Sequence, residues 1–249
     1  MMRRYEAVPH PFVLRPIERL DENGRVSLAL TIFGDGVRHL PLMIYALKEA
    51  AGGERGIAGN RLKLRRVLQE EKPGSDTWAE IFREGDAIAP LPAVSPILPS
   101  APNRIEIRFH TPLRVKRGGL HVRPDIFRFS DLFGNVLRRV SMLMYFHGGA
   151  RLDVPFRELV DRSKSVTCET VLRWKDWLRY SSRQKTEMRL GGVIGAVQVA
   201  DQDLEPFWPF VWLGQWTHAG AGATMGLGHY TIASLPARSV LSQDTTLMP

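Results

Sequence analysis

The chain has 249 residues, 44% of them hydrophobic, so it is long enough for one large domain or two small ones with real cores. Its net charge of +8 at pH 7 favours a polyanionic partner, nucleic acid first and an anionic membrane surface second, with an ordinary basic soluble protein as the alternative. The single cysteine, Cys168, excludes a disulfide framework and a cysteine-based zinc site, and it fits the reducing cytoplasm. The absence of a long apolar run argues against a secretory signal or a membrane span.

The first hundred residues predict strands around at least one helix. Residues 10–14 read as a short strand, and residues 24–34 as a longer one with β-branched and apolar residues between two glycines. Apolar residues then recur at helical spacing across 37–53, where a glycine pair ends the helix. Apolar and basic residues alternate over 62–67, which predicts a strand with one solvated, positive face.

A proline-rich stretch follows at 89–102, with five prolines in fourteen residues. Such a segment is stiff and extended, so we predict a domain boundary here, with one module at 1–103 and another at 104–249. The alternative is an edge segment that runs along a single domain.

The second half of the chain mixes strands with helices. Residues 105–110 alternate strictly between apolar and polar, as a half-buried strand does. A helix is predicted from Ser130, as its N-cap, to a glycine pair at 148–149, and a second, highly charged helical stretch from 153 to 180. Because the elements do not alternate regularly, an α+β fold is favoured over a parallel α/β sheet. The remaining predicted elements are a β-rich segment at 191–199, a buried aromatic segment at 207–216 and a last strand at 229–233.

A glycine-rich loop occupies 218–230, between two histidines. It lacks the Gly-Lys-Ser/Thr ending of a nucleotide-binding P-loop and the spacing of a dinucleotide turn, so ATP and NAD are poor candidates. Glycines allow positive φ and close approach, and successive backbone N–H groups can then bind an anion such as phosphate. A plain loop of tight turns is the alternative.

Three blocks occur in this order: FHTPLRVK at 109–116, YSSRQKTEMRLGGVIG at 180–195 and HAGAGATMGLGHYTI at 218–232. The chain also opens with HPFVLRP and LTIFGDG. Together these blocks resemble the CRISPR-associated endoribonucleases of the RAMP superfamily, which cut precursor CRISPR RNA within its repeats. The resemblance covers residues 9–233. Relatives commonly have more sequence before the HPF segment, and often a lysine where this chain has Ala221. A short member of this kind suits the type IV systems.

The resemblance implies two tandem ferredoxin-like, RRM-like modules, with a helical RNA-binding insertion at about 130–180 and the signature loop at 218–230. It implies cleavage without a metal or other cofactor, leaving a 2′,3′-cyclic phosphate and a 5′-hydroxyl. The implied partners are CRISPR repeat RNA, often a hairpin, the mature crRNA, and other effector subunits, with no membrane. The alternatives are a non-catalytic RAMP-type crRNA-binding scaffold and an enzyme that uses the loop for ATP.

Four residues are candidates for catalysis. The superfamily often draws a catalytic histidine from the first helix of its N-terminal module, and His39 opens the predicted helix beside Arg38. Arg25 and Arg238 are further candidates, because a guanidinium can bind two phosphate oxygens. Surface positions are the alternative for all four. Tyr45 suits the core by its spacing, and the scattered histidines do not predict a metal site.

Basic residues interleaved with aromatic ones predict the RNA-binding surface, because they combine backbone contacts with base stacking. On the predicted second helix, Arg173 and Trp177 would share a face. A solvated helix face is the alternative for this segment, and packing against Trp216 is the alternative for His218 of the loop. The RNA-binding candidates are Arg114, Lys116, Arg117, Arg173, Lys175, Arg179, Arg183 and Lys185, together with His218, Gly220, Gly222, Gly226 and Gly228 of the loop.

Overall fold

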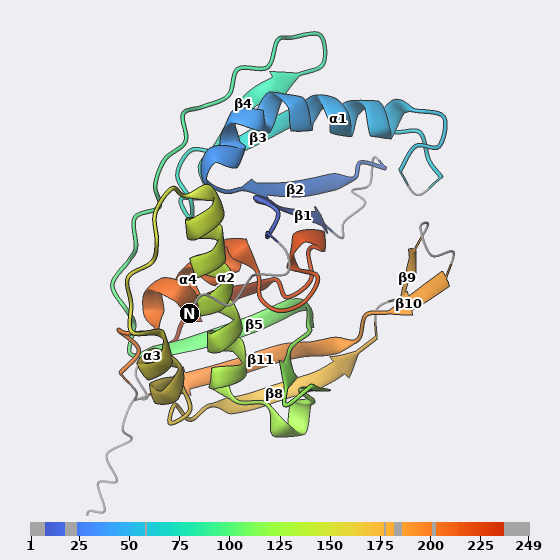
Figure 1. The fold of residues 1–249 in the computed structure, drawn as a ribbon. Helices are drawn as coiled ribbons and strands as arrows, with labels where there is room; N and C mark the ends of the chain where they lie inside the picture. Colours follow the sequence, from blue (N-terminus) through green and yellow to red (C-terminus); the bar gives the residue numbers. More distant parts are fainter. Residues whose placement is uncertain are drawn as a thin grey trace, which may run out of the picture. The chain divides into compact units, whose positions relative to one another are not determined.

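The computed structural model describes residues 8–17, 24–57, 59–176, 178–181, 186–200 and 203–236 (Figure 1). Its contacts divide the chain into two compact units. The N-terminal unit comprises Met1–Ser100 and Arg138–Val154, and the C-terminal unit comprises Ala101–Leu137 and Pro155–Pro249. The first division, after Ser100, lies inside the proline-rich segment. Within the ranges just given, no helix is long and apolar enough to cross a bilayer.

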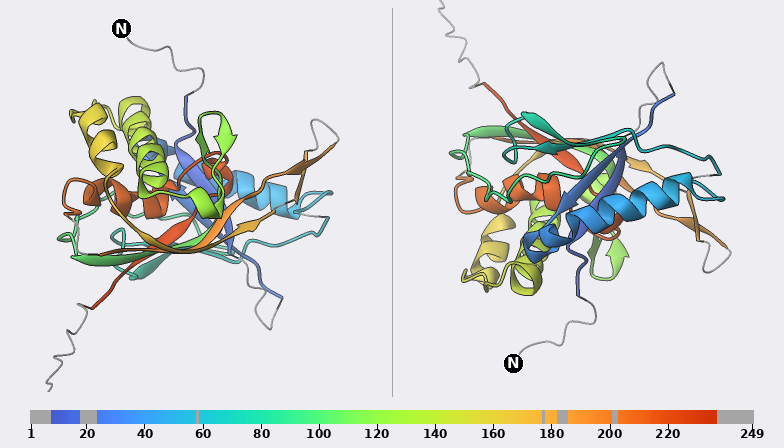
Figure 2. Two further views of the ribbon diagram at one scale, coloured as in Figure 1. Left: turned by 90° about the horizontal axis from the view of Figure 1, so that it is seen from below. Right: turned by 90° about the horizontal axis from the view of Figure 1, so that it is seen from above.

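The N-terminal unit contains two antiparallel strand pairs and a helix. Strand β1 (Phe12–Ile17) pairs with β2 (Ser27–Ile32), and β3 (Arg66–Glu70) pairs with β4 (Trp78–Arg83). The 3₁₀ turn η1 (Gly34–His39) leads from β2 into α1 (Leu40–Gly52), which lies along the β1–β2 pair in Figures 1 and 2. The predicted strands at 10–14 and 24–34 and the helix at 37–53 are therefore confirmed, whereas the strand predicted at 62–67 begins only at Arg66.

Gly34 allows the chain to turn sharply from β2 into η1. Its φ is +52°, a conformation that disfavours side chains, and a Cβ there would overlap the carbonyl oxygen of His147. The α1 helix then starts with Pro41 in its first turn, where a missing N–H costs nothing. Gly34 and Pro41 thus allow η1 to continue directly into α1.

The C-terminal unit is a ferredoxin-like βαββαβ module. Its four strands form one antiparallel sheet in the order β12-β5-β11-β8, with a helix after the first strand and another after the third (Figure 1). The predicted α+β class is thus confirmed. In chain order the module comprises β5 (Arg104–Leu113), the first half of α2 (Phe129–His147), β8 (Glu169–Lys175), β11 (Gly192–Ala200), α4 (Trp208–Thr217) and β12 (Tyr230–Ser234). From Arg138 on, α2 is assigned to the N-terminal unit.

Shorter elements connect these strands and helices. They are β6 (Lys116–Arg117) and β7 (Leu120–His121), which form a hairpin, η2 (Pro124–Ile126), α3 (Phe156–Ser163), β9 (Leu178–Ser181), which pairs with β10 (Thr186–Arg189), and η3 (Ala223–Met225) in the glycine-rich loop.

The core of the C-terminal unit lies between the sheet and its helices. Ile107 and Val197, paired across β5 and β11, are fully buried, and the ring of Phe133 on α2 meets that of Phe207 at 4.8 Å. Burial of each such side chain contributes about 1.5–3 kcal/mol relative to exposure. Tyr230 is also buried, donates its hydroxyl hydrogen to the carbonyl of Val211 at 2.7 Å, and has its pKa raised by that burial.

The helical stretch predicted across 153–180 is wrong after Ser163, where α3 ends. The helical insertion predicted at about 130–180 is therefore helical only in α2 and α3, within the part of it that the structure describes. Among the described residues of 153–180 only α3 is helical, and the chain then forms β8, all seven residues of which pair with β11. Arg173 therefore lies in a strand and shares no helix face with Trp177, which is outside the described residues. The charged composition resembles that of a surface helix, but pairing with a distant strand decides the outcome.

Ser130 is not the N-cap of α2, because the helix already begins at Phe129. Instead, the carboxylate of Asp131 reaches back and accepts the backbone N–H of Arg128 at 2.8 Å. An acid in the first turn satisfies an otherwise unpaired amide there and is favoured by the helix dipole.

Candidate nucleic-acid interface

Arg38 and His39 form an exposed pair at the junction of η1 and α1. The Nε of Arg38 donates to the Nε2 of His39 across 3.2 Å. Because a guanidinium nitrogen can only donate, Nε2 acts as the acceptor and the imidazole in this arrangement is neutral, with its proton on Nδ1. Two of the predicted catalytic residues are therefore in contact, with the Nε2 of His39 beside the guanidinium of Arg38.

The other predicted catalytic residues do not join this pair. Arg25 is exposed just before β2, whereas the pair follows the end of that strand. A strand rises roughly 3.3 Å per residue, which puts Arg25 about 25 Å from that end. Arg238 lies outside the described residues. Tyr45, predicted in the core, is 57% exposed on α1.

In the C-terminal unit, the glycine-rich loop folds back on itself after α4. Gly220, Gly222, Gly226 and Gly228 all have positive φ. A Cβ on Gly228 would overlap the carbonyl oxygen of Ala219, and one on Gly220 would lie 2.5 Å from the carbonyl oxygen of Arg114. Close backbone packing therefore requires glycine at 220 and 228.

Several amides of the loop bond within the protein. The N–H of Ala221 donates to the carbonyl of Arg114 at 2.9 Å, and that of Gly228 donates to the carbonyl of Pro112 at 3.0 Å. These amides are not free for a phosphate in this conformation. Gly226 and Gly228 are buried, whereas Gly220 and Gly222 are half-buried at the rim of the loop.

His218 holds the loop together from inside. Its side chain is only 2% exposed, and its Nδ1 donates to the carbonyl of Leu227 at 3.2 Å. The residue has a φ of +58° where α4 ends. The prediction that this side chain contacts RNA is therefore wrong, because the ring is buried inside the loop.

Thr111 ties β5 to the same loop. Its hydroxyl donates to the carbonyl of Gly226 at 2.7 Å and accepts the N–H of His229 at 2.8 Å. Both partners belong to the C-terminal half of the loop, so one buried hydroxyl fixes that half against the strand.

Replacement of Thr111 by valine is expected to lower the free energy of unfolding by about 1–3 kcal/mol, because two buried backbone groups lose their partner. Thr111→Ser, which keeps the hydroxyl, is the matched control and should retain most of the stability. Chemical denaturation measures both. Equal losses in the two variants would mean that the methyl group, and not the hydroxyl, holds the loop.

A basic and aromatic cluster lies next to the loop, and Arg114 connects the two through its bridge to Gly220. The Nη2 of Arg114 lies 3.5 Å from the Nε2 of His121. The ring of His121 meets that of Trp174 at 6.3 Å, edge to face, and the guanidinium of Arg123 lies 3.8 Å above the ring of Trp174. We call Arg114, His121, Arg123 and Trp174 the hairpin cluster.

Positive charge is concentrated around His121 in the hairpin cluster. Burial lowers the pKa of His121, and the positive charges of Arg114 and Lys116 lower it further. The ring is therefore held neutral among cations, and a bound anion would relieve their mutual repulsion.

Sequence reasoning missed His121 and Arg123. The signal that could have found them is the Gly118–Gly119 pair between alternating residues, which is typical of a tight β-hairpin. Such a hairpin places Lys116 opposite His121.

The remaining predicted RNA-binding residues are dispersed. Arg117 is paired with the carboxylate of Asp131 at 3.1 Å and also donates to the carbonyl of Ile126, so its guanidinium is already bound. Arg173 and Lys175 alternate with Trp174 along β8 and thus lie on the opposite face of the sheet. Arg179 lies in β9, and Arg183 and Lys185 are outside the described residues.

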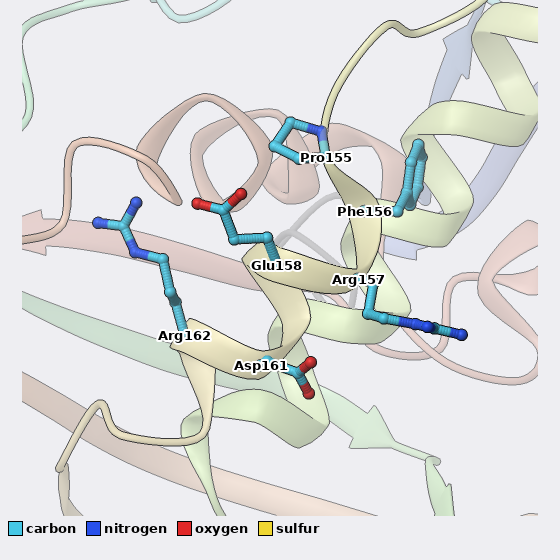
Figure 3. A pocket seen from close by; sticks show the side chains of 6 residues that line it. All are labelled: Pro155, Phe156, Arg157, Glu158, Asp161 and Arg162. Carbon is cyan, nitrogen blue, oxygen red and sulfur yellow. The ribbon is translucent and has the colours of Figure 1, made fainter.

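A shallow hollow runs along α3 (Figure 3). Its lining carries both signs of charge, since Glu158 and Asp161 stand beside Arg157 and Arg162, so it does not form a polyanion surface. In the part of the chain that the structure describes, no three histidine, cysteine or acidic side chains gather as metal ligands.

Comparison with known proteins identifies the family of the C-terminal half. Residues 107–230 match the family of CRISPR-associated endoribonuclease Cas6, and residues 1–93 match a family model described as an N-terminal domain. No curated protein matches the chain.

Solved structures of Cas6 proteins share the fold. A Cas6 product complex is 20% identical with a TM-score of 0.59, and the match covers 92% of this chain and 83% of that chain. A Cas6 substrate mimic complex is 18% identical with a TM-score of 0.54, covering 91% and 86%. Thermus thermophilus Cas6 is 16% identical with a TM-score of 0.55, covering 92% and 81%.

Proposed function

Since the chain belongs, through residues 107–230, to the family of CRISPR-associated endoribonuclease Cas6, we propose that it binds CRISPR repeat RNA and cleaves it to mature crRNA. The net charge of +8 and the hairpin cluster support a polyanionic substrate. The observation that carries the catalytic part is the exposed Arg38–His39 pair at the start of α1.

The reaction we propose needs no metal. The 2′-oxygen of the ribose attacks the adjacent phosphorus while the bond from phosphorus to the 5′-oxygen breaks. His39 takes the proton of the 2′-hydroxyl through Nε2, after Arg38 has turned from that nitrogen to the phosphate. The departing 5′-oxygen acquires a proton from water or from a protonated group, and the products carry a 2′,3′-cyclic phosphate and a 5′-hydroxyl.

Each residue of the pair has a separate role in this scheme. Histidine is the side chain best suited to proton transfer near neutral pH, and such transfer typically contributes about 10²–10⁴-fold in rate. Arg38 cannot act as a base, but its forked guanidinium binds two phosphate oxygens and stabilises the charge that develops on them.

We further propose that the protein keeps its mature crRNA and joins an effector complex as a subunit. A surface that binds phosphates in an uncleaved repeat would bind the same phosphates in the product. We expect a crRNA fragment to co-purify with the protein. We also expect effector subunits to co-purify with it and to be released by ribonuclease treatment.

The experiment that tests the activity mixes the protein with its cognate repeat RNA in EDTA. We expect one cleavage, with a cyclic phosphate identified by mass on the upstream fragment and a 5′-hydroxyl on the downstream one. The control RNA carries a single 2′-deoxy nucleotide at the cut position and should be bound but stay intact. Repeat RNA that remains intact at saturating binding would contradict the enzyme and favour the crRNA-binding scaffold.

A further inference from the structure

Three segments that are distant in sequence build the hairpin cluster. Arg114 follows β5, His121 and Arg123 come from the β6–β7 hairpin and the residues after it, and Trp174 lies in β8. In Figure 1 the segment between β5 and α2 lies beside β8, in agreement with the ring contacts. The tertiary fold therefore assembles the cluster from three separate segments of the chain.

Among the described residues, no carboxylate is paired with the positive charges of this cluster. In the ranges that the structure describes, no ion pair joins Arg114, Lys116 or Arg123 to a carboxylate. The neighbouring Arg117, by contrast, is paired with Asp131. The carboxylate of Asp176 accepts the indole N–H of Trp174 at 3.0 Å, and so fixes that ring.

Trp174 also fixes the orientation of Arg123. The guanidinium lies 3.8 Å from the ring centroid on one face, which is the geometry of a cation–π contact. Arg123 is itself exposed, so its side chain is accessible to a ligand from solvent. RNA-binding proteins stack unpaired bases on such planes, whereas paired bases inside a helix are not available for stacking.

We propose that Arg114, His121, Arg123 and Trp174 form a binding site for an unpaired nucleotide of RNA, with its base stacked on Arg123 and its phosphate on Arg114 and Lys116. This site rests on the proposed RNA substrate but is independent of the Arg38–His39 chemistry. The neutral ring of His121 lies beside the guanidinium of Arg114 without adding to the repulsion among the cations. Through Arg114, the bound nucleotide would adjoin the rim of the glycine-rich loop.

The test measures the affinity of full-length protein variants for a fluorescent repeat RNA that carries the 2′-deoxy block. Arg123→Ala is expected to weaken binding about 10-fold, because stacking of one base contributes about 1–3 kcal/mol. Arg123→Lys keeps the charge but loses the plane, and should weaken binding nearly as much. Arg157→Ala removes one exposed positive charge from α3 of the same unit and is the matched control, with a change below about twofold.

A second arm uses the isolated, fully paired stem of the repeat in place of the whole repeat. The effect of Arg123→Ala should largely disappear there, because no unpaired base is present. Wild-type affinity of Arg123→Lys, or an equal effect of Arg123→Ala on stem and whole repeat, would overturn the site in favour of simple phosphate attraction. If the Arg123 variants do not fold, variants of Trp174 test the same site. Trp174→Phe, which keeps an aromatic face, should bind the repeat RNA at least threefold more tightly than Trp174→Leu.

The outcomes separate this site from the proposed reaction. RNA that is bound in an Arg123-dependent manner but never cleaved supports the nucleotide site and contradicts the nuclease. RNA that is cleaved by a protein whose binding ignores Arg123 and Trp174 contradicts the nucleotide site and leaves the nuclease standing.

Discussion

His39→Ala is expected to slow cleavage of repeat RNA by a factor of about 10²–10⁴ while the affinity for the RNA changes by less than about twofold. The physical reason is that the imidazole Nε2 takes a proton only as the 2′-oxygen attacks, so its loss affects the transition state and not the bound ground state. Single-turnover cleavage and filter binding, measured on the same preparation, give the two quantities.

The matched control is His10→Ala, since His10 is also an exposed histidine of the N-terminal unit and its ring contacts Phe12. This variant should cleave at the wild-type rate. Arg38→Ala should slow cleavage more than it weakens binding, because the guanidinium acts on the developing charge of the phosphorane. A His39→Ala protein that cleaves within threefold of wild type would remove the pair from the catalytic centre.

Gly228→Ala is expected to have the largest effect on stability, with a loss above about 3 kcal/mol or failure of the C-terminal unit to fold. A positive φ costs a residue with a side chain about 1–2 kcal/mol, and here the new Cβ would also overlap the carbonyl oxygen of Ala219. The backbone of the loop would have to separate, and Gly228 would lose its hydrogen bond to Pro112.

Gly118→Ala separates the two causes. Gly118 has a φ of +59°, close to the +66° of Gly228, but nothing lies within 4 Å of a Cβ built on it. Its substitution should therefore cost only the conformational part, about 1–2 kcal/mol. Thermal and urea denaturation compare the pair, and equal losses would show that the loop can relax around a methyl group.

Local patterns in the sequence were sufficient for several strands. The alternation at 105–110 predicted β5, and the apolar runs in the first hundred residues predicted β1 and β2, because one buried face imposes a period of two on any half-buried strand. The glycine-rich segment at 218–230 was likewise predicted as a loop. Its blocks and their order also indicated the family to which residues 107–230 belong.

The same local patterns failed where the outcome depends on a distant partner. The charged stretch that includes Arg173 resembles a surface helix, and only its pairing with β11 makes it the strand β8. Local composition also cannot tell a free arginine from a bound one. Arg117 and Arg114 belong to the same basic run, but Asp131 on α2 pairs with the first and leaves the second next to His121.

By itself, the sequence determined the fold class, strands such as β1, β2 and β5, the family, and the adjacency of Arg38 and His39, since each depends on residues that are close in the chain or on a recognisable block. The tertiary structure alone decided that His218 is buried and that His121, Arg123 and Trp174 meet. Side chains from three separate segments come within contact distance only after the sheet has formed, and no spacing along the chain encodes that distance.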